Sequence, residues 1–351
     1  MRDTARKAFM AALVVVAVVV GTLMLWKLQL LIALLFLAFI IAAAMRPGVE
    51  RLRRIGIPRG VGILIHYAAL GGGLAVLLWA VVPRASNQVR EALPTESELQ
   101  SAADDSSGVK ADVLVWLDNR LDDLPSAGEF VDPALEATLL TFEIFVGIFF
   151  VLASAAYWIF ERERAVTLVT SVLPRPRRKI VRDTWDLIDL KLGAYVRGQG
   201  ILIVLVATVL SLSFWAIGLP FWVLIGIFAG LVEIVPVIGP FAAGALAVGV
   251  GLTVSIPVAI AAGVIVLVVR LVEDYLVIPR VLGDAVGLSP LVVLVSVAAA
   301  ALLFGGFAVL LAIPMAAVLV TLVDVIVLDK DPAEEDVPTV LFPAKDVETT
   351  G

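Results

Sequence analysis

Long apolar runs separated by short polar segments make up most of the chain. An α-helix needs about 20 apolar residues to cross a bilayer. Eight runs are long enough to be candidates: 9–26, 30–45, 60–83, 133–160, 199–217, 221–252, 256–278 and 290–328. Backbone polar groups in lipid must be bonded within their own segment, which favours helices, and the alternating strands of a β-barrel are not seen. The pattern predicts an all-α, polytopic helical membrane protein with about eight transmembrane helices.

Two of these runs carry signs of a turn or a break. Pro236 and Pro240 interrupt the run 221–252, and each removes an amide donor, so this stretch either crosses with a kink or turns back. The run 290–328 is long enough for two passes and contains Gly305 and Gly306 in its middle. We therefore expect broken or hairpin helices in the C-terminal half. Only three residues separate the first two runs, which predicts a helical hairpin rather than a cleaved leader.

Composition supports a membrane protein and argues against several other classes. Of the 351 residues, 61% are hydrophobic, against about 45–50% in soluble domains. This excludes a soluble enzyme, a disordered chain and a nucleic-acid binder. Cysteine is absent and His66 is the single histidine, which argues against thiolate or histidine metal sites. Without a Walker-type sequence, a nucleophile elbow or a zinc-protease helix, we expect no enzyme activity and no cofactor.

The polar segments differ in the sign of their charge. Residues 46–59 hold five arginines and one glutamate, residues 161–197 hold nine basic and five acidic side chains, and residues 84–132 hold eleven acidic and four basic ones. Basic segments remain in the cytoplasm. The pattern therefore predicts that the N-terminus and both basic segments are cytoplasmic, and that the acidic segment lies outside. The acidic tail is expected inside.

Two polar segments have amphipathic patterns. Residues 84–132 show heptad-like apolar spacing, which favours one or two amphipathic helices outside the membrane; a partly disordered acidic loop is the alternative. Residues 179–196 predict a helix that lies along the headgroups or packs beneath the bundle. The expected organisation is helices 1–3 with a basic loop (1–83), the external acidic segment (84–132), helix 4 (133–160), a cytoplasmic basic helix (161–198), the C-terminal membrane helices (199–328) and the acidic tail (329–351).

Ionisable residues inside apolar runs are costly, so each is a candidate for function. Glu143 lies within the fourth run and is expected to face a cavity, or else to pair structurally. Glu233 stands one turn before a helix break formed by Pro236, Gly239 and Pro240. Broken helices in membranes line polar pathways, so we expect a substrate or ion pathway here. The alternative is a simple kink with Glu233 neutralised by a basic partner.

A second charged group lies in the seventh run. Arg270, Glu273 and Asp274 are spaced i, i+3 and i+4, which places them on one side of a helix. They form either a structural ion pair or a relay for ions or protons. Further residues are weaker candidates for gates or hinges: Pro279, Arg280, Gly283, Asp284, Gly305, Gly306 and Pro314.

A series of short motifs extends over most of the chain: Arg46-Pro47, 52–60 (LRRIGIPRG), 194–199 (AYVRGQ), 234–240 (IVPVIGP), 273–283 (EDYLVIPRVLG), 287–290 (GLSP) and 312–314 (AIP). These motifs carry a resemblance to the autoinducer-2 exporter family. It implies an eight-span protein of a bacterial or archaeal inner membrane, a homo-oligomer, and a transport role. Asp274 departs from the commonest family pattern, where this position is neutral.

Three hypotheses for function remain open. The first is a secondary transporter, not driven by ATP, that exports a small polar solute or signalling molecule. The second is an antiporter of Na⁺ or Li⁺ against protons that uses Glu233, Glu273 and Asp274. The third is a scaffold that does not transport and whose external acidic segment binds a partner protein. The expected partners are the lipid bilayer, the solute or cation, and further copies of the chain.

Overall fold

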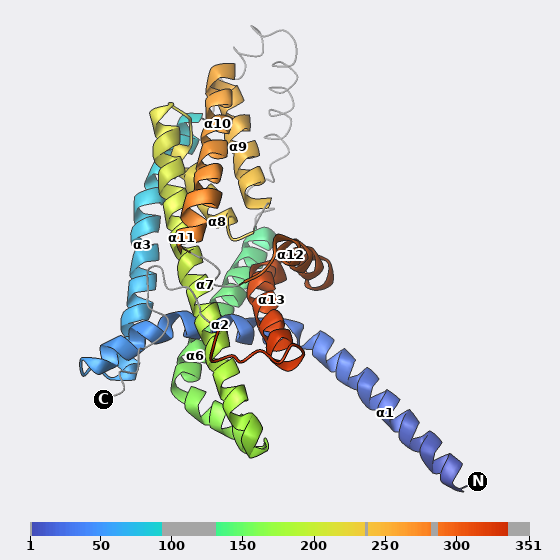
Figure 1. Ribbon diagram of the computed structural model, residues 1–351. Coiled ribbons are helices and arrows are strands. Elements are labelled where there is room, and N and C mark those ends of the chain that lie inside the picture. The colour runs from blue at the N-terminus through green and yellow to red at the C-terminus, as the bar shows by residue number, and fades with distance from the viewer. Residues whose placement is uncertain (1, 93–130, 236–237, 282–286, 336–351) are drawn as a thin grey trace. The chain divides into compact units, whose positions relative to one another are not determined.

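Helices form all of the regular secondary structure in the described part of the chain, which comprises residues 2–92, 131–235, 238–281 and 287–335 of a computed structural model (Figure 1). Six of them are long and apolar enough to cross a membrane, and four shorter apolar helices accompany them. The prediction of an all-α, polytopic membrane protein is confirmed. The chain divides into a first unit (1–66, 150–201 and 276–351) and a second unit (67–149 and 202–275).

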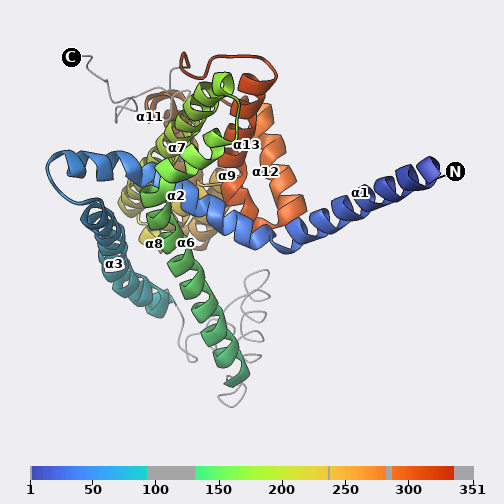
Figure 2. The same ribbon diagram turned by 90° about the horizontal axis from the view of Figure 1, so that it is seen from below.

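The first two helices of the first unit do not form the predicted hairpin. α1 (Arg2–Lys27) and α2 (Gln29–Arg54) are separated by Leu28 alone. Leu28 N–H donates to Met24 O and Ile32 N–H donates to Leu28 O, both at 2.9 Å, so helical bonding continues across the junction. α1 leads away from α2 in both views (Figures 1 and 2). The hairpin prediction was wrong because no glycine or proline stops the helix here.

The last apolar run does form a hairpin. α12 (Pro290–Phe304) and α13 (Gly306–Ile326) pack against each other, as Figure 2 shows. Gly305 lies between them with φ +84°, a backbone conformation that other residues rarely adopt. Ser289 caps the start of α12 by accepting from Val292 N–H at 3.4 Å. The glycine between two apolar stretches therefore ends one helix and allows the chain to reverse.

α7 (Arg175–Ala216) joins the amphipathic stretch and the fifth apolar run into one helix of 42 residues. It follows α6 (Val131–Ser171) after a short turn at Pro174. Within the first unit, Leu192 of α7 is buried in a core with Ile40 and Ala43 of α2 and Leu311 of α13. The apolar face of the amphipathic stretch thus packs against protein.

The second unit contains part of α3 (Arg59–Ala92), α8 (Trp222–Val232), α9 (Ile238–Val254) and α10 (Ile256–Val272) together with residues 202–216 of α7. Phe214, Leu219, Ile225 and Ala247 belong to its buried core. A Cβ on Gly230 of α8 would lie 2.5 Å from the carbonyl oxygen of Ile203 in α7. Such small residues allow helix backbones in a membrane to approach closely.

The sixth apolar run is broken as predicted. α8 has 11 residues, a length of about 16 Å at roughly 1.5 Å per residue, too short for a hydrocarbon core of about 30 Å. Gly239 at the start of α9 donates to Val235 O at 2.9 Å, and a Cβ there would collide with the carbonyl oxygen of Val232. Gly239 therefore lets α9 begin directly against the end of α8.

α10 continues through a π-helical turn, η1 (Glu273–Val277), into α11 (Ile278–Val281). Pro279 has no amide hydrogen, and its ring crowds the carbonyl four residues earlier, that of Tyr275. This explains why the helix widens at these residues. π-Turns inside α-helices are frequent at functional sites, and this turn contains two of the predicted acidic residues.

Candidate functional site

Four of the predicted residues meet in the second unit, and we call them the Arg270 cluster: Glu233, Arg270, Glu273 and Asp274. Arg270 Nη1 lies 2.7 Å from Glu233 Oε1 and 3.5 Å from Glu273 Oε2. Arg270 Nη2 lies 2.9 Å from Asp274 Oδ1. One guanidinium therefore contacts three carboxylates. The i, i+3 and i, i+4 pairs that the sequence spacing predicted are formed.

Three local features bring these side chains together. Glu233 directly follows α8 at the break in the sixth run. Arg270 lies in the last turn of α10, and Glu273 and Asp274 begin the π-turn that follows. The two charged regions that the sequence suggested separately therefore form one group.

The cluster is partly desolvated and carries an excess of negative charge. The side chain of Glu273 is 2% exposed and that of Glu233 is 8% exposed, whereas Asp274 reaches 39%. Glu273 Oε1 is buried without a hydrogen-bond partner among the described residues. When all four groups are ionised, one positive charge faces three negative ones, and such an arrangement favours binding of a proton or cation.

A chelated metal ion fits this arrangement poorly. Among the described residues, no three acidic or histidine side chains converge closely enough to hold one.

Glu233 has the basic partner that the kink alternative required, since it pairs with Arg270. That pairing does not balance the charge, because Glu273 and Asp274 share the same guanidinium.

Within the described part of the chain, the other predicted residues take no part in the ion pairs of the Arg270 cluster. Glu143 is exposed on α6 and forms no ion pair with another described residue. Pro240 belongs to the first turn of α9. Pro279 and Arg280 are exposed in α11, Gly306 begins α13, and Pro314 is buried within α13. Pro236, Gly283 and Asp284 lie outside the described residues, as do 93–130 of the acidic segment and most of the acidic tail.

The first unit contains a buried ionic network that sequence reasoning missed. Arg162 of α6, whose side chain is 7% exposed, donates to Asp189 of α7 through Nε at 2.5 Å and also contacts Asp186. Arg46 of α2 reaches Asp189 as well, at 3.1 Å. The available signal was the position of Asp189, which lies four residues after Trp185 and three before Leu192 and so interrupts the apolar face of the predicted helix. Because the charges are matched, we assign this network to structure.

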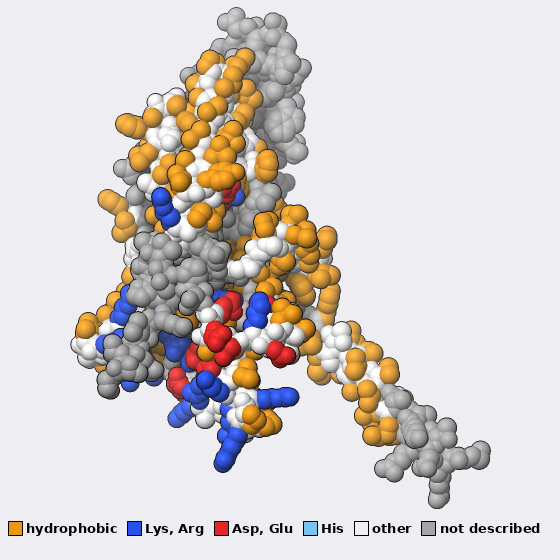
Figure 3. All heavy atoms as spheres, in the orientation of Figure 1, with side chains coloured by type: hydrophobic (Ala, Val, Ile, Leu, Met, Phe, Trp, Pro, Cys, Tyr) orange, Lys and Arg blue, Asp and Glu red, His pale blue; other side chains and the backbone are white. Residues whose placement is uncertain are grey.

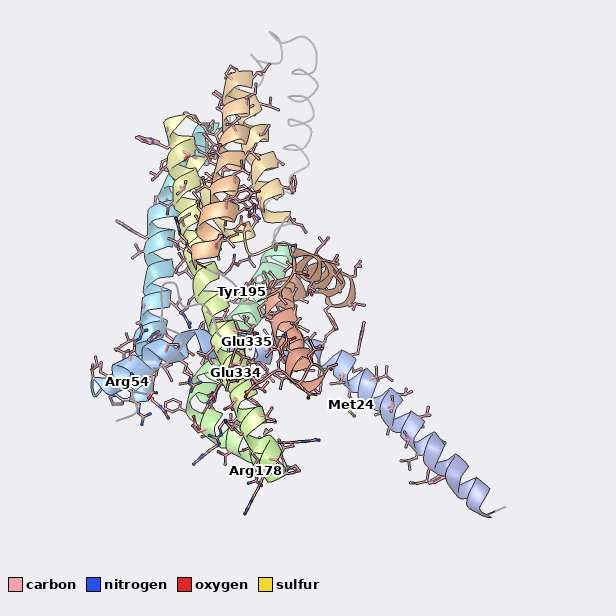
Figure 4. All side chains as sticks on the ribbon, in the orientation of Figure 1. Met24, Arg54, Arg178, Tyr195, Glu334 and Glu335 are labelled. Carbon is pink, nitrogen blue, oxygen red and sulfur yellow. The ribbon has the colours of Figure 1, made fainter. Side chains whose placement is uncertain are left out.

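A second missed contact holds the segment that follows α13. The side chain of Lys191, which is 6% exposed, donates to Thr321 Oγ1 at 3.1 Å and to Glu335 Oε1 at 2.5 Å. Figure 4 shows Glu335 beside α7. This places the beginning of the acidic tail against the helices of the first unit.

The described residues thus define a polytopic helical membrane protein with a largely desolvated charged cluster beside a broken helix. Comparison with known proteins defines the group: residues 10–328 match the AI-2E family transporter model, and the chain belongs to this family. It is 24% identical over 305 residues to "Putative transport protein YrrI" of Bacillus subtilis (81% of this chain, 83% of that protein). It is 27% identical over 297 residues to "Putative transport protein YueF" of the same organism (77% of each).

Proposed function

We propose that this membrane transporter is a secondary carrier that exports a small polar solute, with a proton bound at the Arg270 cluster as the coupling ion. The proposal places the protein in the inner membrane with a cytoplasmic N-terminus, as a homo-oligomer. Family membership supports transport, and the loop charges support the orientation.

One observation supports the proton as coupling ion: a single guanidinium contacts three carboxylates, and one oxygen of the buried Glu273 has no hydrogen-bond partner among the described residues. A proton on Glu273 removes one of the two excess negative charges, so that the oxygen without a partner no longer carries part of a buried negative charge. The carbonyls at the end of α8 add negative potential beside Glu233. These features stabilise the protonated cluster, and solute binding nearby would change how tightly the proton is held.

Binding of the proton would change which carboxylates share the guanidinium of Arg270. When Glu273 is ionised, Arg270 is shared among three acids; when it is neutral, Arg270 is left to Glu233 and Asp274. Arg270 of α10 contacts Glu233, which follows α8, and Asp274, which follows α10. Protonation of one acid is therefore coupled to the strength of the contact that connects α8 to α10.

A second candidate function is exchange of Na⁺ or Li⁺ for protons, with the cation as cargo. Asp274 favours it, because it adds an exposed carboxylate that a hydrated cation can reach. The scaffold hypothesis depends on the external acidic segment, most of which lies outside the described residues, and it stays a prediction.

Everted membrane vesicles test both candidates. A pH gradient is established, a fluorescent dye reports it, and small polar solutes, sodium or lithium are added in turn. We expect a polar solute to dissipate the gradient in the unmodified protein and not in Glu273→Gln. Glu161→Gln is the matched control, since Glu161 is exposed and outside the cluster. Dissipation by sodium or lithium alone would favour the antiporter, and equal activity in Glu273→Gln would remove the cluster from the mechanism.

A further inference from the structure

The first unit contains a cavity of about 940 Å³ that the transport proposal does not use. Side chains of α2, α6, α7 and α13 line it, together with Leu173 in the turn between α6 and α7 and Asp329 after α13. Pockets that hold small organic ligands have volumes of roughly 300–1,000 Å³ and mostly apolar walls. The size of this cavity therefore matches that of a ligand site.

Aromatic and aliphatic side chains form most of the cavity wall. Phe39 packs edge-on against Trp158 with a centroid distance of 5.2 Å, and Trp158 stacks on Trp185 at 5.8 Å. Leu322 and Ile188 contribute aliphatic surface. Trp185 Nε1 is buried and has no hydrogen-bond acceptor in the described residues. Such walls favour a hydrocarbon chain and disfavour a small polar solute.

Two opposite charges also line the cavity. Arg177 near the start of α7 and Asp329 after α13 are both exposed. Within the described part of the chain, neither side chain has an ion-pair partner. The adjacent Arg178 is occupied, because it donates to Leu173 O at 2.9 Å and to Ser171 O at 3.1 Å. Figure 4 shows Arg178 at the turn between α6 and α7, and Figure 3 shows Lys and Arg side chains gathered around this turn.

We propose that this cavity binds one membrane phospholipid with a zwitterionic headgroup. An acyl chain lies among Phe39, Trp158 and Trp185. The phosphate pairs with Arg177 and the ammonium group of the headgroup pairs with Asp329. A guanidinium and a carboxylate at one apolar cavity complement a molecule that carries a phosphate, an ammonium and a hydrocarbon chain. The lipid is a resident ligand, distinct from the exported solute and from the proton.

Charge complementarity selects this lipid class over the alternatives. A purely anionic headgroup would bring its charge towards Asp329, which repels it. A hydrocarbon chain alone would leave Arg177 without a counter-charge. A lipid in the general annulus would contact helix surfaces on one side only, whereas here four helices and Asp329 contribute to the wall.

Native mass spectrometry of the full-length protein provides the test. The protein is purified from membranes and titrated with phosphatidylethanolamine or phosphatidylglycerol of identical acyl chains. Leu322→Trp fills the cavity. Val323→Trp is its matched control, because the next residue of α13 is 49% exposed and does not line the cavity. Size-exclusion profiles and thermal unfolding of both variants show whether each is folded.

We expect the unmodified protein and Val323→Trp to retain one phosphatidylethanolamine, and Leu322→Trp to lose it by at least about tenfold in occupancy. Arg177→Gln and Asp329→Asn together should abolish the preference for phosphatidylethanolamine over phosphatidylglycerol and leave the fold intact. Equal lipid retention by the two tryptophan variants would overturn the proposal. So would equal binding of both lipids by the unmodified protein, or a change of oligomeric state in Leu322→Trp alone, which would identify a second copy of the chain as the occupant.

Discussion

Replacing Arg270 by glutamine should cost far more folding stability than replacing Glu273 by glutamine, although the two residues belong to one ionic group. Arg270 is the single cation of the cluster and lies at 2.7, 2.9 and 3.5 Å from three acids. At an effective dielectric constant near 20, each contact corresponds to an attraction of about 5–6 kcal/mol before desolvation is subtracted.

The net magnitudes are smaller because burial of the charges opposes these attractions. Removal of one partner from a buried ion pair typically costs about 3–5 kcal/mol, and we expect Arg270→Gln to fall in this range, since three carboxylates are left without a cation. Glu273→Gln removes one of the excess negative charges and keeps a hydrogen-bonding side chain of the same size. Its effect should stay within about 1 kcal/mol.

Thermal unfolding of the purified protein in one detergent checks this difference. Arg270→Gln should lower the transition temperature by several degrees, and Glu273→Gln should leave it nearly unchanged while abolishing proton-coupled transport. Combining the two substitutions should recover part of the loss, because less negative charge remains. A larger loss in Glu273→Gln than in Arg270→Gln would refute the charge argument and would indicate a matched structural ion pair.

Three further substitutions test packing and ionic contacts elsewhere in the two units. Gly239→Ala should destabilise the protein by about 1–3 kcal/mol, because its Cβ collides with the end of α8, whereas Gly249→Ala in the same helix has open space and should be neutral in thermal unfolding. Arg162→Ala should cost about 3–5 kcal/mol in the same measurement, while the exposed Arg164→Ala should cost less than about 1 kcal/mol. Glu335→Gln should speed tryptic cleavage after α13 by weakening the contact with α7; an unchanged cleavage rate would contradict that role for the contact.

The sequence predicted the helical membrane architecture because it depends on two local features. The length of an apolar run determines whether a helix can cross the membrane, and Pro236, Pro240 and Gly305 interrupt helices only within a few residues of their own positions. The break between α8 and α9 and the hairpin of α12 and α13 follow from them. The prediction of an α1–α2 hairpin was wrong because a short polar interval does not by itself end a helix. The backbone of Leu28 keeps the helical hydrogen bonds to residues four positions before and after it.

The sequence predicted the charged residues of the candidate site in two separate groups, but it did not predict the contact between these groups. The spacing of Arg270, Glu273 and Asp274 determines contacts along one helix, so the sequence was sufficient for that group. The contact of Arg270 with Glu233 joins residues 37 positions apart and depends on how α8 and α10 pack. The network of Arg162 and Asp189 was missed for the same reason, since neither residue has a local partner that reveals its burial.

Infrared difference spectroscopy of the protein in liposomes shows whether Glu273 binds a proton, because it detects the carbonyl stretch of a protonated carboxyl group without needing the solute. The sample is titrated across neutral pH, and the unmodified protein is compared with Glu273→Gln and Glu161→Gln. The account predicts a neutral-acid band that titrates in the unmodified protein and in Glu161→Gln and is lost in Glu273→Gln. A spectrum of Glu273→Gln identical to that of the unmodified protein would contradict it.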